Sequence, residues 1–156
     1  MKSVLISIRP KWCELIASGR KTIEVRKTRP KLETPFKCYI YMTGVGGIIG
    51  EFVCDEIDAY IYARDFQDSG ETDEVSMYYI TFEQGKRTGL TYSELEDYGQ
   101  GETLYGWHIS DLTIYDRPRG LWEFQREETT GAWSRFVPLT RPPQSWCYVE
   151  EVTQDD

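Results

Sequence analysis

The sequence predicts an α+β domain whose short strands form a curled or closed sheet. Its 156 residues are the length of one ordinary domain, and 40% of them are hydrophobic, as in a globular chain. No internal repeat or linker divides the chain. The predicted elements run strand, helix, several strands, short helix, strand, and mixed short strands with two helices are typical of a curled or closed sheet.

The first elements are the clearest. Residues 3–8 are almost continuously apolar and β-rich, which predicts a buried strand. Pro10 suits the first position of a helix and Gly19 suits the position after its end, so we expect a helix over residues 10–18. Residues 21–27 alternate in polarity and predict a strand with Ile23 and Val25 on one face.

The later elements follow from turn residues and alternation. We expect a loop over 28–35, strands over 36–43 and 48–54, and an exposed loop or insertion over 64–74. Residues 75–82 fit a strand or a helix, and 84–89 a polar turn. Thr91 and Glu94 form a capping box that starts a short helix ending near Gly99. A strand is predicted over 104–115.

Residues 118–156 show few periodic signals. We expect an irregular tail anchored by Trp122, Phe124, Trp133 and Trp146. The domain assignment is therefore a main domain over residues 1–117 and a C-terminal extension over 118–156 that wraps the same domain.

Charge is distributed unevenly along the chain. The net charge of −8 argues against a general nucleic-acid binder. Residues 1–37, however, hold ten Lys/Arg and three Asp/Glu, a net charge of +7, and the remainder carries −15. This pattern fits one positive patch or cleft, and it fits equally a basic surface that acidic neighbours neutralise.

The cysteines and the apolar runs argue against several kinds of site and protein. Cys13, Cys38, Cys54 and Cys147 have no C-x-x-C spacing, so we expect free, mostly buried thiols, no metal site and no cofactor. No apolar run approaches the ~18 residues of a membrane span. We expect a cytoplasmic protein that does not contact membranes, and the sequence leaves its oligomeric state open.

The most informative segment is Gly19-Arg20-Lys21-Thr22-Ile23-Glu24-Val25-Arg26. Glu24 and Arg26 share one face of the predicted strand, and Lys21 lies at the mouth of the preceding turn. Charges at this density need mutual pairing or a polar ligand. From spacing alone, a surface ion-pair network on an edge strand is the favoured interpretation.

This segment matches the pattern G-x-K-x-x-E-x-R and resembles the signature of the ASCH domain family, within the PUA-like β-barrel superfamily. Residues 48–52 and 105–112 resemble a core strand and a late strand of bacterial and phage-type members, so the resemblance covers about residues 1–117. It implies a PUA-like β-barrel with two or more short helices packed on it. It also implies a charged cleft lined by Lys21, Glu24 and Arg26.

PUA-like domains commonly bind RNA or modified nucleotides, so the resemblance implies RNA, a nucleotide or a modified nucleoside as partner. Lys21 and Arg26 would then hold phosphate, and Glu24 would orient Arg26 or accept a hydrogen bond from a base amine. Aromatic rings could stack a base. The further ligand-binding candidates are Arg9, Tyr41 and Trp107, with Trp12 and Tyr39 as other rings considered for stacking.

Two alternatives stay open. Some relatives of the family are amidohydrolases that use the motif Lys and a Thr three residues later, but that Thr position is Glu24 here. An amidohydrolase- or ribonuclease-like hydrolase would therefore use Glu24 as general base and Lys21 to stabilise an oxyanion. His108, the only histidine, is interpreted as a hydrogen-bonded core residue. The second alternative is a phage or prophage accessory protein-interaction module, suggested by the acidic 55–74 stretch and the aromatic tail.

Overall fold

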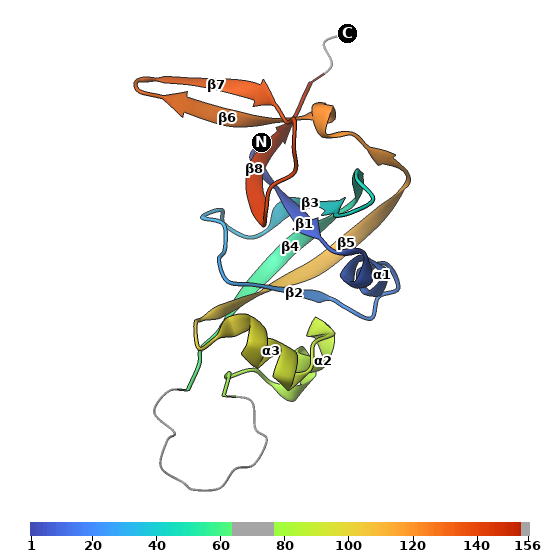
Figure 1. The fold of residues 1–156 in the computed structure, drawn as a ribbon, viewed down its shortest axis with the longest axis vertical. Coiled ribbons are helices and arrows are strands. Elements are labelled where there is room, and N and C mark those ends of the chain that lie inside the picture. The colour runs from blue at the N-terminus through green and yellow to red at the C-terminus, as the bar shows by residue number, and fades with distance from the viewer. Residues whose placement is uncertain (64–76, 154–156) are drawn as a thin grey trace, which may run out of the picture.

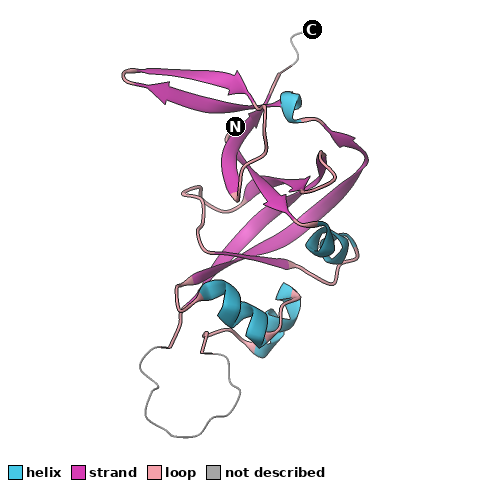
Figure 2. Ribbon diagram, viewed as in Figure 1, coloured by secondary structure: helices cyan, strands magenta, loops and turns pink. Residues whose placement is uncertain are grey.

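The computed structural model describes residues 1–63 and 77–153, which form an eight-stranded sheet and three α-helices (Figures 1 and 2). The strands, in chain order, are β1 (Ser3–Ile8), β2 (Ile23–Arg26), β3 (Phe36–Met42), β4 (Ile48–Tyr60), β5 (Leu104–Arg119), β6 (Phe124–Thr130), β7 (Trp133–Pro138) and β8 (Trp146–Glu151). The helices are α1 (Pro10–Ala17), α2 (Phe82–Thr88) and α3 (Tyr92–Gly99), with a short 3-10 helix η1 (Leu121–Glu123).

The sheet is open, although its α+β class is as predicted. Its strand order is β2-β5-β4-β3-β1-β8-β6-β7, and no pairing among the described residues joins β2 to β7. The closed barrel that the resemblance implied is therefore not confirmed. All the paired strands are antiparallel except β1 and β3, which run parallel.

β1 is buried on both faces, which explains its continuous apolar sequence. On one face Val4, Ile6 and Ile8 pack in a core with Trp107 and the buried side of α1. On the other face Leu5 packs in a second core, whose buried members also include Tyr39, Ile48, Phe124, Leu139 and Val149. A third cluster places Ile23 and Val25 of β2 against Leu95 of α3.

The helix ends follow from local chemistry. α1 has Pro10 at its start, and Gly19 adopts a φ of +80° just after its end, so the helix predicted over 10–18 is confirmed to within one residue. The capping box of Thr91 and Glu94 begins α3 as predicted.

Two expectations about boundaries are wrong. The predicted turn over 84–89 is helix α2, which the Thr81 hydroxyl caps by accepting a hydrogen bond from the Gln84 amide. The strand predicted to end at Cys54 continues through a bulge to Tyr60, because residues 57–60 pair with residues 104–107 of β5.

The C-terminal tail is also more regular than expected. β8 pairs with the central strand β1, and β6 and β7 form a hairpin beside it that extends away from the helices (Figure 1). Phe124 is buried and Trp146 half-buried, but Trp122 and Trp133 are exposed and do not anchor the tail.

The predicted loop over 64–74 lies outside the described residues, as does the first part of 75–82. The rest of that segment forms an isolated bridge between Tyr78 and Tyr62 before α2 begins. Among the described helices, none combines the length and apolar character needed to cross a membrane.

Candidate functional site

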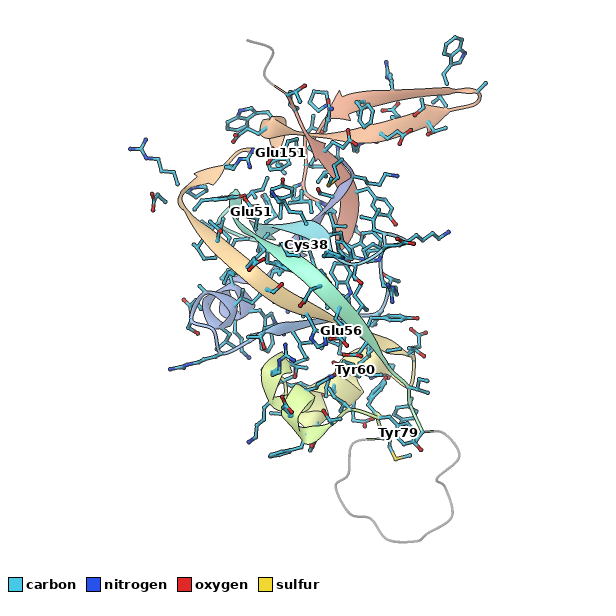
Figure 3. All side chains as sticks on the ribbon, turned by 180° about the vertical axis from the view of Figure 1, so that it is seen from behind. Cys38, Glu51, Glu56, Tyr60, Tyr79 and Glu151 are labelled. Carbon is cyan, nitrogen blue, oxygen red and sulfur yellow. The ribbon has the colours of Figure 1, made fainter. Side chains whose placement is uncertain are left out.

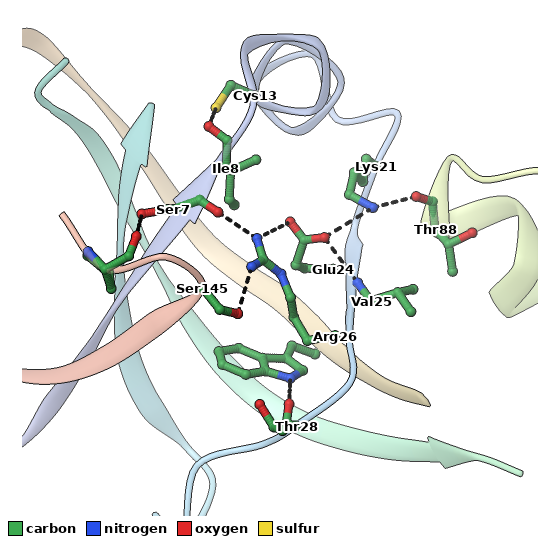
Figure 4. A network of polar contacts seen from close by, with 12 residues as sticks. Ser7, Ile8, Cys13, Lys21, Glu24, Val25, Arg26, Thr28, Thr88 and Ser145 are labelled. Atoms are coloured by element: carbon green, nitrogen blue, oxygen red, sulfur yellow. Dashed lines mark hydrogen bonds and ion pairs between the residues drawn. The ribbon is translucent and has the colours of Figure 1, made fainter. Parts of the chain in front are cut away.

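The charged residues of the motif meet at β2, between α1 and the end of α2 (Figure 4). The Lys21 ammonium (Nζ) lies 3.7 Å from Glu24 Oε1, and Arg26 Nη2 lies 3.7 Å from Glu24 Oε2. β2 is an end strand of the sheet, as the surface-network interpretation required, but Lys21 and Glu24 are buried. The motif thus forms a largely buried chain of alternating charges.

Lys21 is almost completely covered, with 1% of its surface exposed. Its ammonium donates a hydrogen bond to the Thr88 carbonyl oxygen over 2.5 Å and lies 5.3 Å from the centre of the Trp12 ring. Burial lowers the pKa of Lys21 below 10.5 and outweighs the opposing attraction of Glu24. A lysine in this setting loses its proton more readily than one in water.

Only one of the two carboxylate oxygens of Glu24 accepts a hydrogen bond from the described residues. Its Oε1 accepts a hydrogen bond from the Val25 amide over 3.1 Å. Its Oε2 is buried and accepts none from the residues that the structure describes. Buried carboxylate oxygens in folded proteins nearly always have a donor, so Oε2 is a position where a ligand donor would be favourable.

Arg26 connects the motif to the C-terminal tail. Its Nη2 donates to the Ser7 carbonyl oxygen over 2.7 Å and its Nη1 donates to Ser145 Oγ over 3.1 Å (Figure 4). Sequence reasoning missed both Ser145 and Thr88. Neither has a sequence signal, because each reaches the site only through the fold.

Of the aromatic candidates, the structure brings Trp12 and Trp107 to the motif. The half-buried Trp12 ring has its centre 5.3 Å from the Lys21 ammonium, and Trp107 pairs with Glu24 across strands β2 and β5. Trp107 lies in the core with none of its surface exposed, so its ring offers no free face for stacking. Tyr39 is also buried, and Tyr41 packs with it in the second core, on the other face of the sheet. Arg9 is exposed at the start of α1. The predicted charged cleft is not confirmed either, since Lys21 is covered by Thr88 and Trp12.

A second polar cluster lies where β4 and β5 meet α2. His108 Nε2 lies 2.6 Å from Asp58 Oδ2, and His108 Nδ1 lies 3.3 Å from Arg87 Nη2. Arg87 Nε also donates to Thr22 Oγ1 over 2.8 Å, which joins this cluster to the motif segment. His108 is therefore a buried, hydrogen-bonded residue, as the sequence suggested.

Glu56 completes this cluster, with Oε2 3.8 Å from His108 Nδ1. Ligand atoms of Glu56, Asp58 and His108 lie within 4.8 Å of one another, and no other set of three or more His, Cys, Asp or Glu among the described residues is grouped in this way. The arrangement does not fit a metal ion. Asp58 faces Nε2 while Glu56 faces Nδ1, on the other side of the ring, and the 2.6 Å contact is that of a hydrogen bond.

Among the described residues, the cysteine thiols make no hydrogen bond to the charged side chains of either cluster, although Cys54 Sγ donates to the Glu56 carbonyl oxygen. All four are free, with Cys13, Cys38 and Cys54 buried and Cys147 half-buried. Burial raises the pKa of Cys13 and of Cys54 to about 12, so these thiols stay protonated at neutral pH and are poor nucleophiles.

Comparisons with known proteins agree with this architecture. The crystal structure of ASCH from Zymomonas mobilis is similar to this chain with a TM-score of 0.58 and 20% sequence identity, covering 95% of this chain and 87% of that one. A mutant of the Zymomonas mobilis ASCH protein gives a TM-score of 0.59 and 20% identity over 96% and 91% of the two chains. At this identity the likeness shows a shared fold. No curated protein matches the chain. The family model of the ASCH domain matches residues 6–115, more than two thirds of the sequence. The chain belongs to the ASCH domain family.

Proposed function

We propose that this protein binds RNA or a nucleotide through Lys21, Glu24 and Arg26. The observation that carries the proposal is Glu24 Oε2, a buried acceptor without a hydrogen bond from the described residues. The exocyclic amine of a base is a donor of the right kind, and a donor supplied by the ligand would offset the desolvation of this oxygen.

The exposed cations around β2 support a phosphate-bearing ligand. Six of them form no ion pair with the residues that the structure describes: Arg9, Lys11, Arg20, Lys27, Arg29 and Lys31. They lie on α1 and its two flanks and on the segment after β2, at the two ends of that strand (Figure 1). Unpaired cations of this kind attract phosphates. The net charge of −8 favours a small ligand or a short single strand over a duplex.

The test is a thermal-shift screen with nucleosides, nucleotides and short RNA oligomers. A ligand that binds the folded state raises the melting temperature by mass action. We expect a shift for the wild-type protein that Lys21→Met abolishes. Lys86→Met is the matched control, because Lys86 is an exposed lysine on α2 outside the motif cluster and should leave the shift intact. No shift at millimolar ligand would contradict the proposal.

A hydrolase is the second candidate, and the lowered pKa of Lys21 favours it. Lysines with depressed pKa values next to a carboxylate are common in catalytic sites. In such an amidohydrolase- or ribonuclease-like enzyme, Glu24 would act as general base and Lys21 would stabilise developing negative charge. Product analysis of each thermal-shift ligand tests this candidate. A converted ligand, with conversion lost and binding kept in Glu24→Gln, would support an enzyme, and an intact ligand would support a binding protein.

A further inference from the structure

The end of α2 closes the motif site. Thr88, the last residue of α2, places its carbonyl oxygen 2.5 Å from the Lys21 ammonium. Any ligand atom that replaces this contact needs the end of α2 to move. Gly89 follows directly, with a φ of +71°, so the helix stops here and the chain turns away. What holds this end of α2 therefore controls access to Lys21.

Arg87, the neighbour of Thr88, fastens α2 to the rest of the domain. Its carbonyl oxygen accepts a hydrogen bond from the Thr22 amide over 2.9 Å, and its Nε donates to Thr22 Oγ1. The third contact is its Nη2 against His108 Nδ1, at 3.3 Å. Arg87 has no carboxylate within ion-pair distance among the described residues, so the imidazole is its main side-chain partner besides Thr22.

The contacts of His108 assign its protons. An arginine can only donate, so Nδ1 must accept and carries no hydrogen, while Nε2 donates its hydrogen to Asp58 Oδ2. The closed arrangement thus requires a neutral imidazole. A proton on Nδ1 would remove the acceptor that Arg87 uses and place two cations together.

Glu56 offers the protonated ring another partner. Its Oε2 lies 3.8 Å from Nδ1, and its side chain is 62% exposed and free to approach. The charged or titratable groups around His108 are Asp58, Glu56 and Tyr60 from β4 and Arg87 from α2. The neighbouring residue just before β2 is the uncharged Thr22. Cys54, also on β4, keeps its proton because burial raises its pKa to about 12.

We propose that His108 is a pH-sensitive latch on α2. Neutral His108 holds Arg87 and so keeps Thr88 over Lys21. Protonated His108 donates from Nδ1 to Glu56, releases Arg87 and opens the site. The inference deepens the proposed function, since it explains how a ligand reaches a buried lysine.

The opening is measured without any ligand, by hydrogen exchange of the Thr22 amide, which donates to the Arg87 carbonyl oxygen. We expect its protection factor, corrected for the intrinsic pH dependence of exchange, to fall about tenfold between about pH 7.5 and about pH 5.5. Amides of β1 and β3 in the core should keep their protection. Constant protection of Thr22 over this range overturns the latch.

Two variants assign the pH dependence to His108. His108→Gln keeps a donor for Asp58 but cannot gain a proton, so protection of Thr22 should become independent of pH. If His108→Gln does not fold, Glu56→Gln provides the test at an exposed position. It replaces the carboxylate that accepts from the protonated ring with a neutral amide, which stabilises the cationic ring less, so protection should be lost only at a lower pH. An unchanged pH dependence in either folded variant overturns the latch.

Because the hydrogen-exchange experiment contains no ligand, its outcome does not depend on the proposed function. A latch that opens in a protein that binds no nucleotide would refute only the function. If both hold, the ligand found in the thermal-shift screen should bind more tightly at about pH 5.5 than at about pH 7.5, and His108→Gln should remove that difference.

Discussion

Two charged networks near opposite ends of β5 use the same residue types in different ways. At one end Arg119 donates from Nε to Glu123 over 3.2 Å and from Nη1 to Glu151 over 3.0 Å. Glu151 also accepts from the Tyr39 hydroxyl over 2.7 Å. At the other end Glu24 stands 3.7 Å from each of its two cations. Figure 3 shows Glu51 and Glu151 at the first end, away from α2 and α3.

The two networks differ in how completely their polar atoms are hydrogen-bonded, and not in the kinds of charge that they contain. The Arg119 network is partly exposed, makes hydrogen bonds of normal length, and stacks its guanidinium near the rings of Tyr115 and Phe124. The motif network is buried, has longer ion pairs, and leaves one carboxylate oxygen without a hydrogen bond from the described residues. The first arrangement stabilises the fold. Under-satisfied polar groups in the second are typical of a site kept for a ligand.

The largest expected effect comes from breaking the buried network at its centre. Glu24→Ala would leave Lys21 buried without its carboxylate, and removing one partner of a buried ion pair costs about 3–5 kcal/mol. We expect the free energy of unfolding, measured in urea at neutral pH, to fall by about this amount. A loss below about 1 kcal/mol would show that Glu24 is not the counter-charge of Lys21.

A smaller loss is expected at the exposed network. Arg119→Ala removes two partly exposed ion pairs and the contacts with aromatic rings, for a loss of about 1–2 kcal/mol in the same urea experiment. Nucleotide binding should not change. Arg117→Ala is the control, since Arg117 is an exposed neighbour on β5 and should alter stability by less than about 0.5 kcal/mol. Loss of ligand binding in Arg119→Ala would show that the ligand binds near Arg119 and not at the motif on β2.

The smallest effect is a pH dependence at Glu151. Burial raises the pKa of this carboxyl, but the hydrogen bonds from Tyr39 and Arg119 outweigh burial and lower the pKa below 4.5. The ionised form therefore stabilises the folded state above about pH 4.5, and this contribution is lost as the pH falls through the lowered pKa.

Glu151→Gln should reduce the loss of unfolding free energy below about pH 4.5. It should leave the pH dependence of this free energy near neutral pH unchanged. The amplitude should stay below about 1 kcal/mol, because the side chain is half exposed. Urea unfolding from about pH 6 to about pH 3 measures it. An acid limb of equal slope in the variant would contradict the assignment.

Several elements of the fold could be predicted because their signals are local. Pro10 and Gly19 mark the ends of α1, the Thr91–Glu94 capping box marks the start of α3, and alternation marks β2. The tail could not be predicted in this way. β8 is a strand because it pairs with β1, some 140 residues away in sequence, and its own residues carry only weak alternation.

The candidate site was predictable to the same extent. Lys21, Glu24 and Arg26 lie within six residues, so one strand and one turn bring them together. Thr88 and Ser145 contribute a carbonyl oxygen and a hydroxyl from distant segments, and a backbone carbonyl has no residue signature at all. Burial of Trp107 likewise depends on packing against β1 and β3, which its neighbours in sequence do not reveal.

The central claim is that the buried charges at β2 are kept for binding and not for stability. The most direct measurement is the melting temperature of wild-type protein and of Lys21→Met/Glu24→Leu, each with and without the ligand from the thermal-shift screen. Replacing a buried ion pair with apolar residues of similar volume is often neutral or stabilising. We predict that the double variant melts no lower than wild type and shows no shift with ligand. A double variant that melts well below wild type, or that still responds to the ligand, would contradict the claim.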